Sequence, residues 1–257
     1  MPDRIDPTSD RPVFRQLADL LREDVRSGRL VPGDRLPSET ELMNRFRAAR
    51  GTVRQAIAVL RTEGLIQVEH GRGAFVRLRQ PVRRLAHDRF ARRHRDAGKA
   101  AFHAETETAG HTPSVEVIDV RKDRCPNDVA VLLKLRRGTA VLVRERRYFV
   151  DDEPVELATS YIPWNLASGT PMAEQYTGPG GIYARLEELG HRLAKFTEEV
   201  RSRSPLPEER RSLRLADGVP VFELRRTACD VEGRAVEVCD TVLAADRFVL
   251  TYELPAT

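Results

Sequence analysis

The stretch AARGTVRQAIAVLRTEGLI, residues 48–66, constrains this chain more than any other part of its sequence. Its apolar side chains recur at steps of three and four residues, as they do along one face of an α-helix. These apolar positions are Val53, Ile57 and Leu60. Arg50 and Arg54 are about one helical turn apart and lie on a different face. The stretch therefore predicts a helix over residues 50–63, ended by Gly64, that packs through one face and carries arginines on another.

Two further helices are predicted upstream. Residues 12–27 repeat apolar side chains at helical spacing, and Gly28 begins the turn that ends this helix. In the next segment, LPSETELMNRF, Ser38 is followed three residues later by Glu41, which is the spacing of a capping box at a helix N-terminus. The first part of the chain therefore predicts three short helices in succession.

The segment LIQVEHGRGAFVRL predicts a β-hairpin after the third helix. β-Branched and aromatic residues flank HGRG, and its glycines permit the positive backbone dihedral angles of a hairpin turn. Three helices followed by a hairpin, or wing, is the element order of a winged helix-turn-helix. Such a fold leaves one helix free to enter the major groove of DNA, which is wide enough to admit an α-helix.

Three blocks of sequence carry a family resemblance. GDRLPSETEL, RGTVRQAIAVLRTEGLI and HGRGAFV occur in this order, and together they resemble the DNA-binding head of GntR-type bacterial transcription regulators. The similarity covers residues 11–78. It implies double-stranded DNA as a partner, with the third helix contacting base edges or phosphates and the wing reaching the minor groove. The residues that this resemblance assigns to DNA binding are Thr40, Arg50, Thr52, Arg54, His70, Gly71 and Arg72.

The sequence departs from the family pattern at three positions of this head. The family commonly has arginine at position 40, serine or threonine at 49 and threonine at 51, where this chain has Thr40, Ala49 and Gly51. Alanine cannot cap a helix with its side chain, which typically costs about 1 kcal/mol of helix stability. These departures bear on the operator sequence and the affinity, and not on the groove-binding mode.

Residues 79–99, RQPVRRLAHDRFARRHRDAGK, are predicted to be an interdomain linker. They hold a cluster of arginines and no sustained apolar stripe. The net charge is +4 over residues 1–80, +5 over residues 81–99 and −5 over residues 100–257. A basic front and an acidic rear indicate that only the front part of the chain meets a polyanion.

Residues 100–255 are predicted to form a domain of alternating strands and helices, which gives the whole chain an α+β fold. Seven segments have the alternating character of strands. The strand candidates are 114–120, 140–150, 154–161, 197–203, 220–229, 234–244 and 248–253, and the helical candidates between them are 127–134, 181–189 and 207–213. The architecture expected from them is a sheet with flanking helices.

An internal repeat refines this prediction. LLKLRRGTAVLVRERRYFVDDEPVEL and SLRLADGVPVFELRRTACDVEGRAVEV share a helix end, a glycine turn, a strand, an acidic turn and a second strand. Their anchors, Gly138 and Gly218, are 80 residues apart. Two similar hairpin units in one sheet predict a pseudo-symmetric domain with a pocket between its halves.

A second resemblance covers this rear domain. DDEPVELATSYIP, supported by DVEGRAVEVCDTVLAADRF, is similar to the effector-sensing UTRA domain of the HutC subfamily of GntR-type regulators. That domain resembles the chorismate lyase fold, an antiparallel sheet flanked by helices. Two arginines on one strand face suit a carboxylate or phosphate through forked hydrogen bonds, so the expected effector is a small anion. The residues assigned to effector binding are Arg144, Arg146, Thr159, Tyr161, Glu237 and His103.

The last part of the domain departs from the UTRA pattern. Leu243 and Phe248 stand where the family has tyrosines, and Ala244 stands where it often has arginine. These replacements weaken the case for a sugar phosphate as the effector.

Several other classes of protein are disfavoured. No apolar run approaches the roughly 20 residues of a membrane helix, and the first residues lack the features of a secretion signal, so a cytoplasmic protein is expected. The cysteines Cys125, Cys229 and Cys239 form no CxxC pair, and the six histidines show no metal-ligand spacing. GxSxG, Walker and GxGxxG motifs are absent from the sequence. We therefore expect no metal, no cofactor and no enzymatic activity.

The predicted function is that of a homodimeric transcription regulator, most often a repressor in this family. Two rear domains would pair, and two heads would bind half-sites of a palindromic operator about one DNA turn apart. An effector would favour a head separation unsuited to that spacing, with the linker as the joint. Two other functions stay open: a chorismate lyase-like enzyme acting on a small aromatic acid, and a nonspecific architectural DNA binder.

Overall fold

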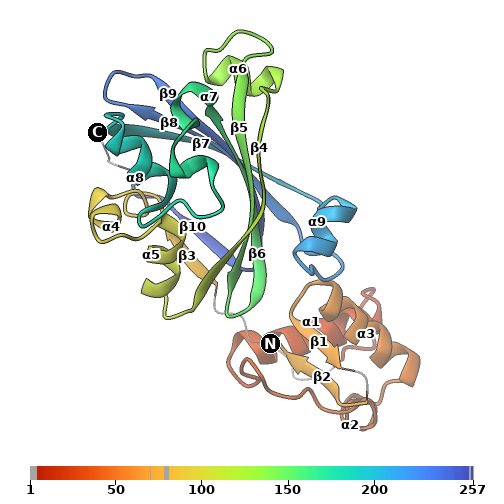
Figure 1. Cartoon of the computed structure of the whole chain (residues 1–257). Helices are drawn as coiled ribbons and strands as arrows, with labels where there is room; N and C mark the ends of the chain where they lie inside the picture. Colours follow the sequence, from red (N-terminus) through yellow and green to blue (C-terminus); the bar gives the residue numbers. More distant parts are fainter. Residues whose placement is uncertain (1–4, 70, 78–80, 255, 257) are drawn as a thin grey trace. The chain divides into compact units, whose positions relative to one another are not determined.

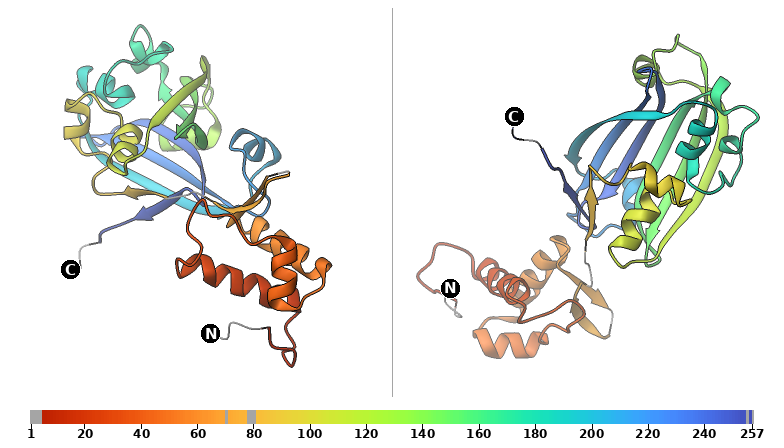
Figure 2. Two further views of the ribbon diagram at one scale, coloured as in Figure 1. Left: turned by 90° about the horizontal axis from the view of Figure 1, so that it is seen from below. Right: turned by 90° about the vertical axis from the view of Figure 1, so that its left-hand side faces the viewer.

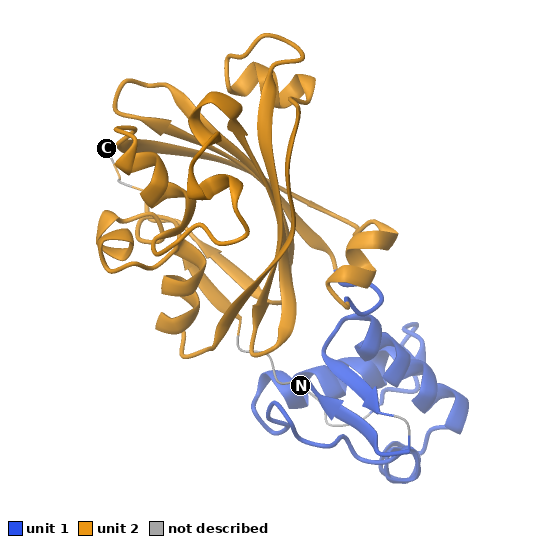
Figure 3. Ribbon diagram, viewed as in Figure 1, with its two compact units in different colours: residues 1–80, 215–219 blue, residues 81–214, 220–257 orange. Residues whose placement is uncertain are grey.

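The computed structural model describes residues 5–69, 71–77, 81–254 and 256. These residues form two compact units, each described by itself below (Figures 1 and 3). The first unit comprises residues 1–80 together with residues 215–219, and the second comprises residues 81–214 and 220–257.

The first unit is a winged helix-turn-helix. Its elements are α1 (Val13–Arg26), α2 (Glu39–Phe46), α3 (Arg50–Thr62), β1 (Ile66–Glu69) and β2 (Gly73–Val76). β1 and β2 pair antiparallel, with Ile66 opposite Val76 and Glu69 opposite Gly73. The predicted order of three helices and a hairpin is confirmed.

Local sequence explains where these helices begin. The Ser38 side chain accepts a hydrogen bond from the Glu41 backbone N–H at 3.3 Å, and the Glu41 carboxylate accepts one from the Ser38 N–H at 2.7 Å. This is the predicted capping box of α2. α3 begins after Ala49 without a side-chain cap, because a methyl group accepts no hydrogen bond. The apolar faces of the helices and the hairpin meet in one core, formed by Leu17, Leu21, Leu36, Leu42, Phe46, Val53, Ala56, Leu60, Ile66 and Val76.

The second unit is built on a six-stranded antiparallel sheet with the strand order β4-β5-β6-β9-β8-β7. Its strands are β4 (Pro113–Arg124), β5 (Ala140–Val150), β6 (Glu153–Pro163), β7 (Leu193–Arg203), β8 (Val221–Asp230) and β9 (Ala235–Ala244). The six corresponding strand predictions are confirmed, with the largest differences at the ends of β4 and β7. The antiparallel sheet with flanking helices is the expected α+β architecture.

The internal repeat of the sequence corresponds to a repeat of structure. The hairpin β5-β6 and the hairpin β8-β9 lie side by side, and β6 pairs antiparallel with β9 at the centre of the sheet. β4 and β7 flank the two hairpins as equivalent edge strands. The predicted pseudo-symmetric arrangement of two hairpin units in one sheet is therefore confirmed.

Helices cover one face of this sheet. α4 (Arg92–Asp96), α5 (Ala101–Thr108) and α8 (Gly181–Glu188) lie over that face (Figure 2). The remaining helices are α6 (Asn127–Leu132), α7 (Trp164–Ala167), the 3-10 turn η1 (Pro171–Ala173) and α9 (Pro207–Ser212). The covered face is where a pocket forms between sheet and helices.

The segment predicted as a linker has structure of its own. β3 (Val82–Leu85) pairs in parallel with β10 (Phe248–Thr251), and α4 follows. Residues 81–99 therefore belong to the second unit, while residues 79 and 80 lie outside the described residues. The arginine cluster suggested an exposed segment, but Arg84 is only 2% exposed and is neutralised by buried glutamates. The sequence pattern alone therefore did not indicate a strand here.

Candidate functional site

Helix α3 presents two arginines to solvent. The side chains of Arg50 and Arg54 are 68% and 66% exposed, whereas Val53, on another face of the helix, is fully buried. Thr52 is half-buried, and Thr40 is exposed on α2. Exposed arginines near the start of a helix are suited to phosphates and to guanine edges in a DNA groove.

A single carboxylate bridges these two arginines. Arg50 donates from Nε to Glu39 Oε2 at 2.9 Å, and Arg54 donates from Nε to Glu39 Oε1 at 3.0 Å. The hydrogen bond from Arg50 is the largest cause that lowers the pKa of Glu39. Sequence reasoning did not single out Glu39, although its position next to Thr40 at the start of α2 places it beside the arginine-bearing helix.

The wing carries a further arginine. Arg72 is exposed at the turn of the hairpin, pairs with Glu69, and has its guanidinium 5.6 Å from the centre of the Phe75 ring. Gly71 adopts a φ of 74°, which favours glycine at this turn. His70, assigned to DNA binding from sequence, lies outside the described residues.

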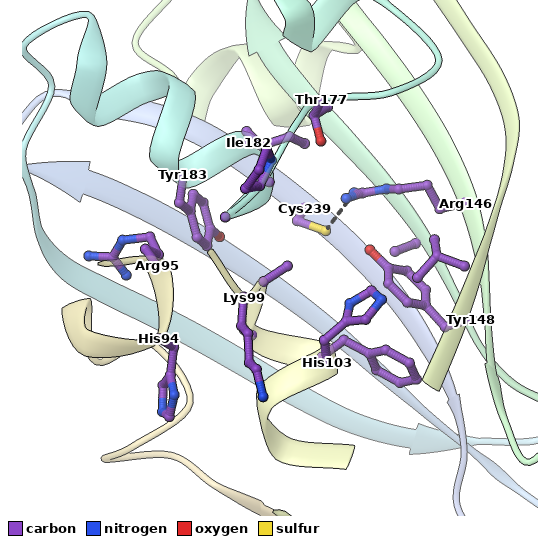
Figure 4. A pocket seen from close by; sticks show the side chains of 18 of the residues that line it. His94, Arg95, Lys99, His103, Arg146, Tyr148, Thr177, Ile182, Tyr183 and Cys239 are labelled. Atoms are coloured by element: carbon purple, nitrogen blue, oxygen red, sulfur yellow. Dashed lines mark hydrogen bonds between the residues drawn. The ribbon is translucent and has the colours of Figure 1, made fainter. Parts of the chain in front are cut away.

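The second unit encloses a cavity of about 400 Å³ (Figure 4). Strands β4, β5, β6, β8 and β9 supply its floor, and residues within 89–107 and 175–183 supply its walls. Four of the six residues assigned to effector binding line it: Arg144, Arg146, Glu237 and His103. A volume of this size suits a small metabolite.

Arg146 lines this cavity without an ion pair among the described residues, and while burial acts to lower its pKa, the charge of Glu237 acts to raise it. It donates to Ser160 Oγ and lies 4.0 Å from Cys239 Sγ, and no carboxylate of the described residues lies within 4.0 Å of it. Its buried Nε has no hydrogen-bond partner in that part of the chain. In Figure 4, Arg146, Tyr148 and His103 point into the same space.

Arg144 has a different role from its neighbour. It is 3% exposed and donates to backbone carbonyls of the segment that forms one wall of the cavity, including Gln175 O at 2.7 Å. Burial, followed by the charge of Arg146, lowers the pKa of Arg144 to about 10. Arg144 therefore holds the wall in place and adds positive potential to the pocket.

Glu237 lies at the centre of a buried hydrogen-bond network. It accepts from Ser160 Oγ at 2.7 Å and from the Tyr183 hydroxyl at 2.6 Å, and that hydroxyl accepts from Arg226 Nε at 2.8 Å. Burial raises the pKa of Tyr183 well above its usual range. Tyr183 is therefore a neutral donor at neutral pH, and Glu237 already has its partners within the protein.

Thr159 and Tyr161 were expected on the pocket face, and the sheet register places them on the other face. Arg144 pairs with Ser160, whereas Thr159 and Tyr161 pair with Glu145 and Val143. Directly opposed residues of antiparallel strands share a face, so Ser160 is the residue that turns toward the cavity. Neither Thr159 nor Tyr161 lines it. The expectation for these two residues is corrected.

Sequence reasoning also missed several residues of the pocket. Arg226 pairs with Cys239 across the β8-β9 hairpin, so the alternation of that hairpin carried a signal for it. Tyr183 and the wall at residues 89–107 come from helices that approach the sheet only in the folded chain. Periodicity within one segment cannot reveal such contacts.

The described residues contain neither a metal-binding cluster nor a membrane-spanning helix. Among the residues that the structure describes, no group of three or more histidine, cysteine, aspartate or glutamate side chains is placed to hold a metal ion. In the same residues, no helix is long and apolar enough to cross a membrane.

Comparisons with known families agree with this geometry. A model of the UTRA domain matches residues 108–249, and a model of bacterial regulatory proteins of the gntR family matches residues 14–76. An uncharacterized HTH-type transcriptional regulator of Streptomyces coelicolor is 33% identical over 248 residues, covering 94% of this chain and 92% of its own length. The HTH-type transcriptional repressor NagR of Bacillus subtilis is 26% identical over 249 residues, covering 96% of this chain and 97% of its own.

Solved structures give the same result. A GntR-family transcriptional regulator superimposes with a TM-score of 0.64 at 28% identity, covering 96% of this chain and 99% of that one. PhnF from Mycobacterium smegmatis has the same fold, with a TM-score of 0.61 at 23% identity over 94% of this chain and 99% of its own.

A DNA-binding head followed by a domain with a metabolite-sized pocket defines a ligand-responsive transcription regulator. The chain belongs to the GntR family of bacterial regulatory proteins and carries a UTRA effector-sensing domain. This pairing of domains is the one expected for the HutC subfamily. The predicted function of a DNA-binding regulator modulated by a small metabolite is thus confirmed at the level of the family.

Proposed function

We propose that this regulator is a cytoplasmic homodimeric repressor, and that a small anionic metabolite in the pocket releases it from a palindromic operator. The observation that carries the proposal is Arg146, whose guanidinium faces the cavity without a carboxylate within 4.0 Å among the described residues. A buried charge without a partner is unfavourable. A carboxylate or phosphate of the ligand would supply the missing charge through charge-assisted hydrogen bonds.

The DNA-binding part of the proposal rests on exposed residues of the head. Arg50, Thr52 and Arg54 would contact base edges and phosphates in the major groove, with Thr40 beside them. The wing residues Gly71 and Arg72, with His70, would approach the minor groove. The relative NagR is a transcriptional repressor, and we extend this direction of regulation to the present chain as part of the proposal.

A dimer follows from the geometry of DNA recognition. One winged head spans one half-site, and two heads related by a two-fold axis match a palindrome. The effector would bind the DNA-competent and the released arrangements with different affinities, since a ligand with equal affinity for both shifts neither.

We infer that the pocket binds its ligand without transforming it. Relatives over most of the chain are transcription regulators. Polar groups around the pocket also have structural partners, because Ser160 and Tyr183 both donate to Glu237. Incubation of the pure protein with each anion that binds it, followed by chromatography, should return the anion unchanged.

A thermal-shift screen tests the effector directly. The full-length protein is heated with inorganic phosphate, sugar phosphates, organic acids and amino-acid derivatives, and at least one anion should raise the melting temperature in a concentration-dependent way. Arg146→Ala should abolish that shift. The matched control is Arg147→Ala, because Arg147 is the next residue of β5, points to the opposite face and pairs with Glu116.

Comparison of these two variants distinguishes anion binding at Arg146 from a nonspecific electrostatic effect of losing one arginine. Loss of the shift in Arg146→Ala and its retention in Arg147→Ala supports the proposed site. Equal responses of both variants, or no response of the wild type to any anion, contradicts it.

A further inference from the structure

The bridge from Glu39 to the two exposed arginines of α3 has a specific geometry. Each arginine uses only its Nε, and each meets a different oxygen of the same carboxylate. Among the described residues, the terminal Nη groups of Arg50 and Arg54 form no hydrogen bond, and both side chains stay about two-thirds exposed. The carboxylate thus binds the Nε of each guanidinium and leaves its two Nη groups available to a partner.

Glu39 itself is firmly placed. It is the first residue of α2, directly after the N-cap Ser38, whose capping box with Glu41 fixes the start of the helix. The positive end of the helix dipole favours a carboxylate in this first turn. The Glu39 side chain is 31% exposed, so water does not fully replace its contacts with the arginines.

An exposed arginine without such a contact samples many rotamers and binds any phosphate within reach. Sequence reading requires a guanidinium whose forked donors are held toward one base edge. A negative charge beside the arginines also opposes their use on phosphates, because it repels the DNA backbone. One carboxylate at this place therefore acts on both specificity and nonspecific affinity.

We propose that Glu39 is a positioning residue that orients Arg50 and Arg54 for base reading and suppresses their nonspecific binding to phosphates. This inference rests on the proposed DNA contacts of the two arginines. It goes beyond those contacts, because it assigns a role in recognition to an acidic residue that need not touch DNA.

A purely structural role is the alternative reading of the same ion pairs. α2 and α3 are already joined by buried apolar residues, among them Leu42, Phe46 and Val53. Exposed ion pairs contribute little to stability. If Glu39 only stabilised the packing of α2 against α3, its loss would change the affinity for every DNA sequence in the same direction. Loss of a positioning residue instead changes the affinities for specific and nonspecific sequences in opposite directions.

The experiment uses the full-length protein and two duplexes of equal length and composition. One is the consensus that the wild type selects from a random-sequence pool, and the other is its scrambled version. Glu39→Gln should weaken binding to the consensus and strengthen binding to the scrambled duplex, so that their affinity ratio falls about tenfold, as expected when one base contact loses its geometry. The salt dependence of scrambled-duplex binding should steepen, because freed arginines neutralise additional phosphates.

The matched control is Glu63→Gln. Glu63, the C-cap of α3, joins that helix to α1 through a forked ion pair with the partly buried Arg22, and Glu63→Gln changes the net charge by the same amount as Glu39→Gln. Its affinity ratio should equal that of the wild type. Glu39→Asp keeps the charge on a shorter side chain, and should keep the low affinity for scrambled DNA while losing part of the affinity for the consensus.

The remaining outcomes overturn the inference. If Glu39→Gln shifts both affinities by the same factor in either direction, or shifts neither, Glu39 is only a structural or general electrostatic residue. Arg50→Ala and Arg54→Ala, measured in parallel, separate this failure from failure of the proposed contacts. If these two variants also leave the ratio unchanged, the arginines do not read bases and both proposals fall.

Discussion

The two units of this protein place the same side chain in opposite environments. In the DNA-binding head, Arg50 and Arg54 are 68% and 66% exposed. In the second unit, Arg84 and Arg144 are 2% and 3% exposed. Water solvates the first pair, which stays available to a polyanion, whereas the second pair must find its partners within the protein or in a ligand. Burial, and not arginine content, decides whether an arginine binds DNA or organises a pocket.

The largest effect is expected at the most completely paired buried arginine. Arg84 donates from Nη2 to Glu105 and Glu156, both at 2.7 Å. Burial acts to lower the pKa of Arg84, and the two glutamates outweigh it and raise that pKa. Arg84→Met leaves the buried Glu156 without a cation and leaves Glu105 with Arg89 alone, 3.4 Å away. It should lower the free energy of unfolding by about 3–5 kcal/mol, measured by urea denaturation.

A combined variant shows whether this cost comes from charge or from packing. Arg84→Met together with Glu105→Gln and Glu156→Gln removes the three charges that Arg84 joins and leaves Arg89 paired with Glu198. This variant should recover part of the lost stability. If the single variant is as stable as the wild type, the buried charges of the second unit do not behave as described.

Arg146 should respond in the opposite way, because it forms no ion pair among the described residues. Arg146→Ala should lower the free energy of unfolding by no more than about 1.5–3 kcal/mol, the range for one hydrogen bond made by a charged group. It should reduce the affinity for the anion that stabilises the wild type by about 10- to 100-fold, measured by calorimetry. A strong loss of stability without loss of anion binding would assign Arg146 to the scaffold.

The exposed arginines should affect binding and leave stability unchanged. Arg54→Ala should weaken binding to the selected consensus duplex by about 1–3 kcal/mol and relax base preference at one symmetric pair of positions, measured by fluorescence anisotropy and repeated selection. The control Arg61→Ala lies at the other end of the same helix and should retain the preference. An Arg54→Ala protein with unchanged affinity and preference would remove Arg54 from the DNA contacts.

The smallest effect is expected at the start of α3. Ala49→Ser supplies the missing side-chain cap, and should increase the protection of α3 backbone amides by about 1 kcal/mol, measured by hydrogen exchange in the full-length protein. Ala58→Ser, in the exposed middle of the same helix, should slightly decrease that protection. Equal effects of the two serines would show that capping does not limit this helix.

The head was predictable from the sequence because its signals are local. The helical spacing of Val53 and Leu60 and the capping box of Ser38 and Glu41 each lie within a few residues. Strand existence in the second unit was predictable for the same reason, as the bounds of β5 show: residues 140–150 were expected and residues 140–150 form the strand.

The details of the pocket depend on contacts that no local pattern contains. Which face Thr159 takes is set by the register of β5 against β6, and that register shifts between Tyr148 and Phe149. β3 has only four residues, and its arginine is buried against glutamates distant in sequence. The Glu39 bridge likewise forms only when two helices meet. Such features require the three-dimensional structure.

Regulation itself is tested most directly by one titration. Full-length wild type and Arg146→Ala are bound to the selected consensus duplex, and the stabilising anion is added to each. The anion should lower the DNA affinity of the wild type by about 5- to 150-fold, the usual range of allosteric coupling. Arg146→Ala should bind the duplex as tightly as the wild type, and its DNA affinity should not change when the anion is added. An unchanged affinity of the wild type, or an equal response of the variant, would contradict control of the head by an anion bound at Arg146.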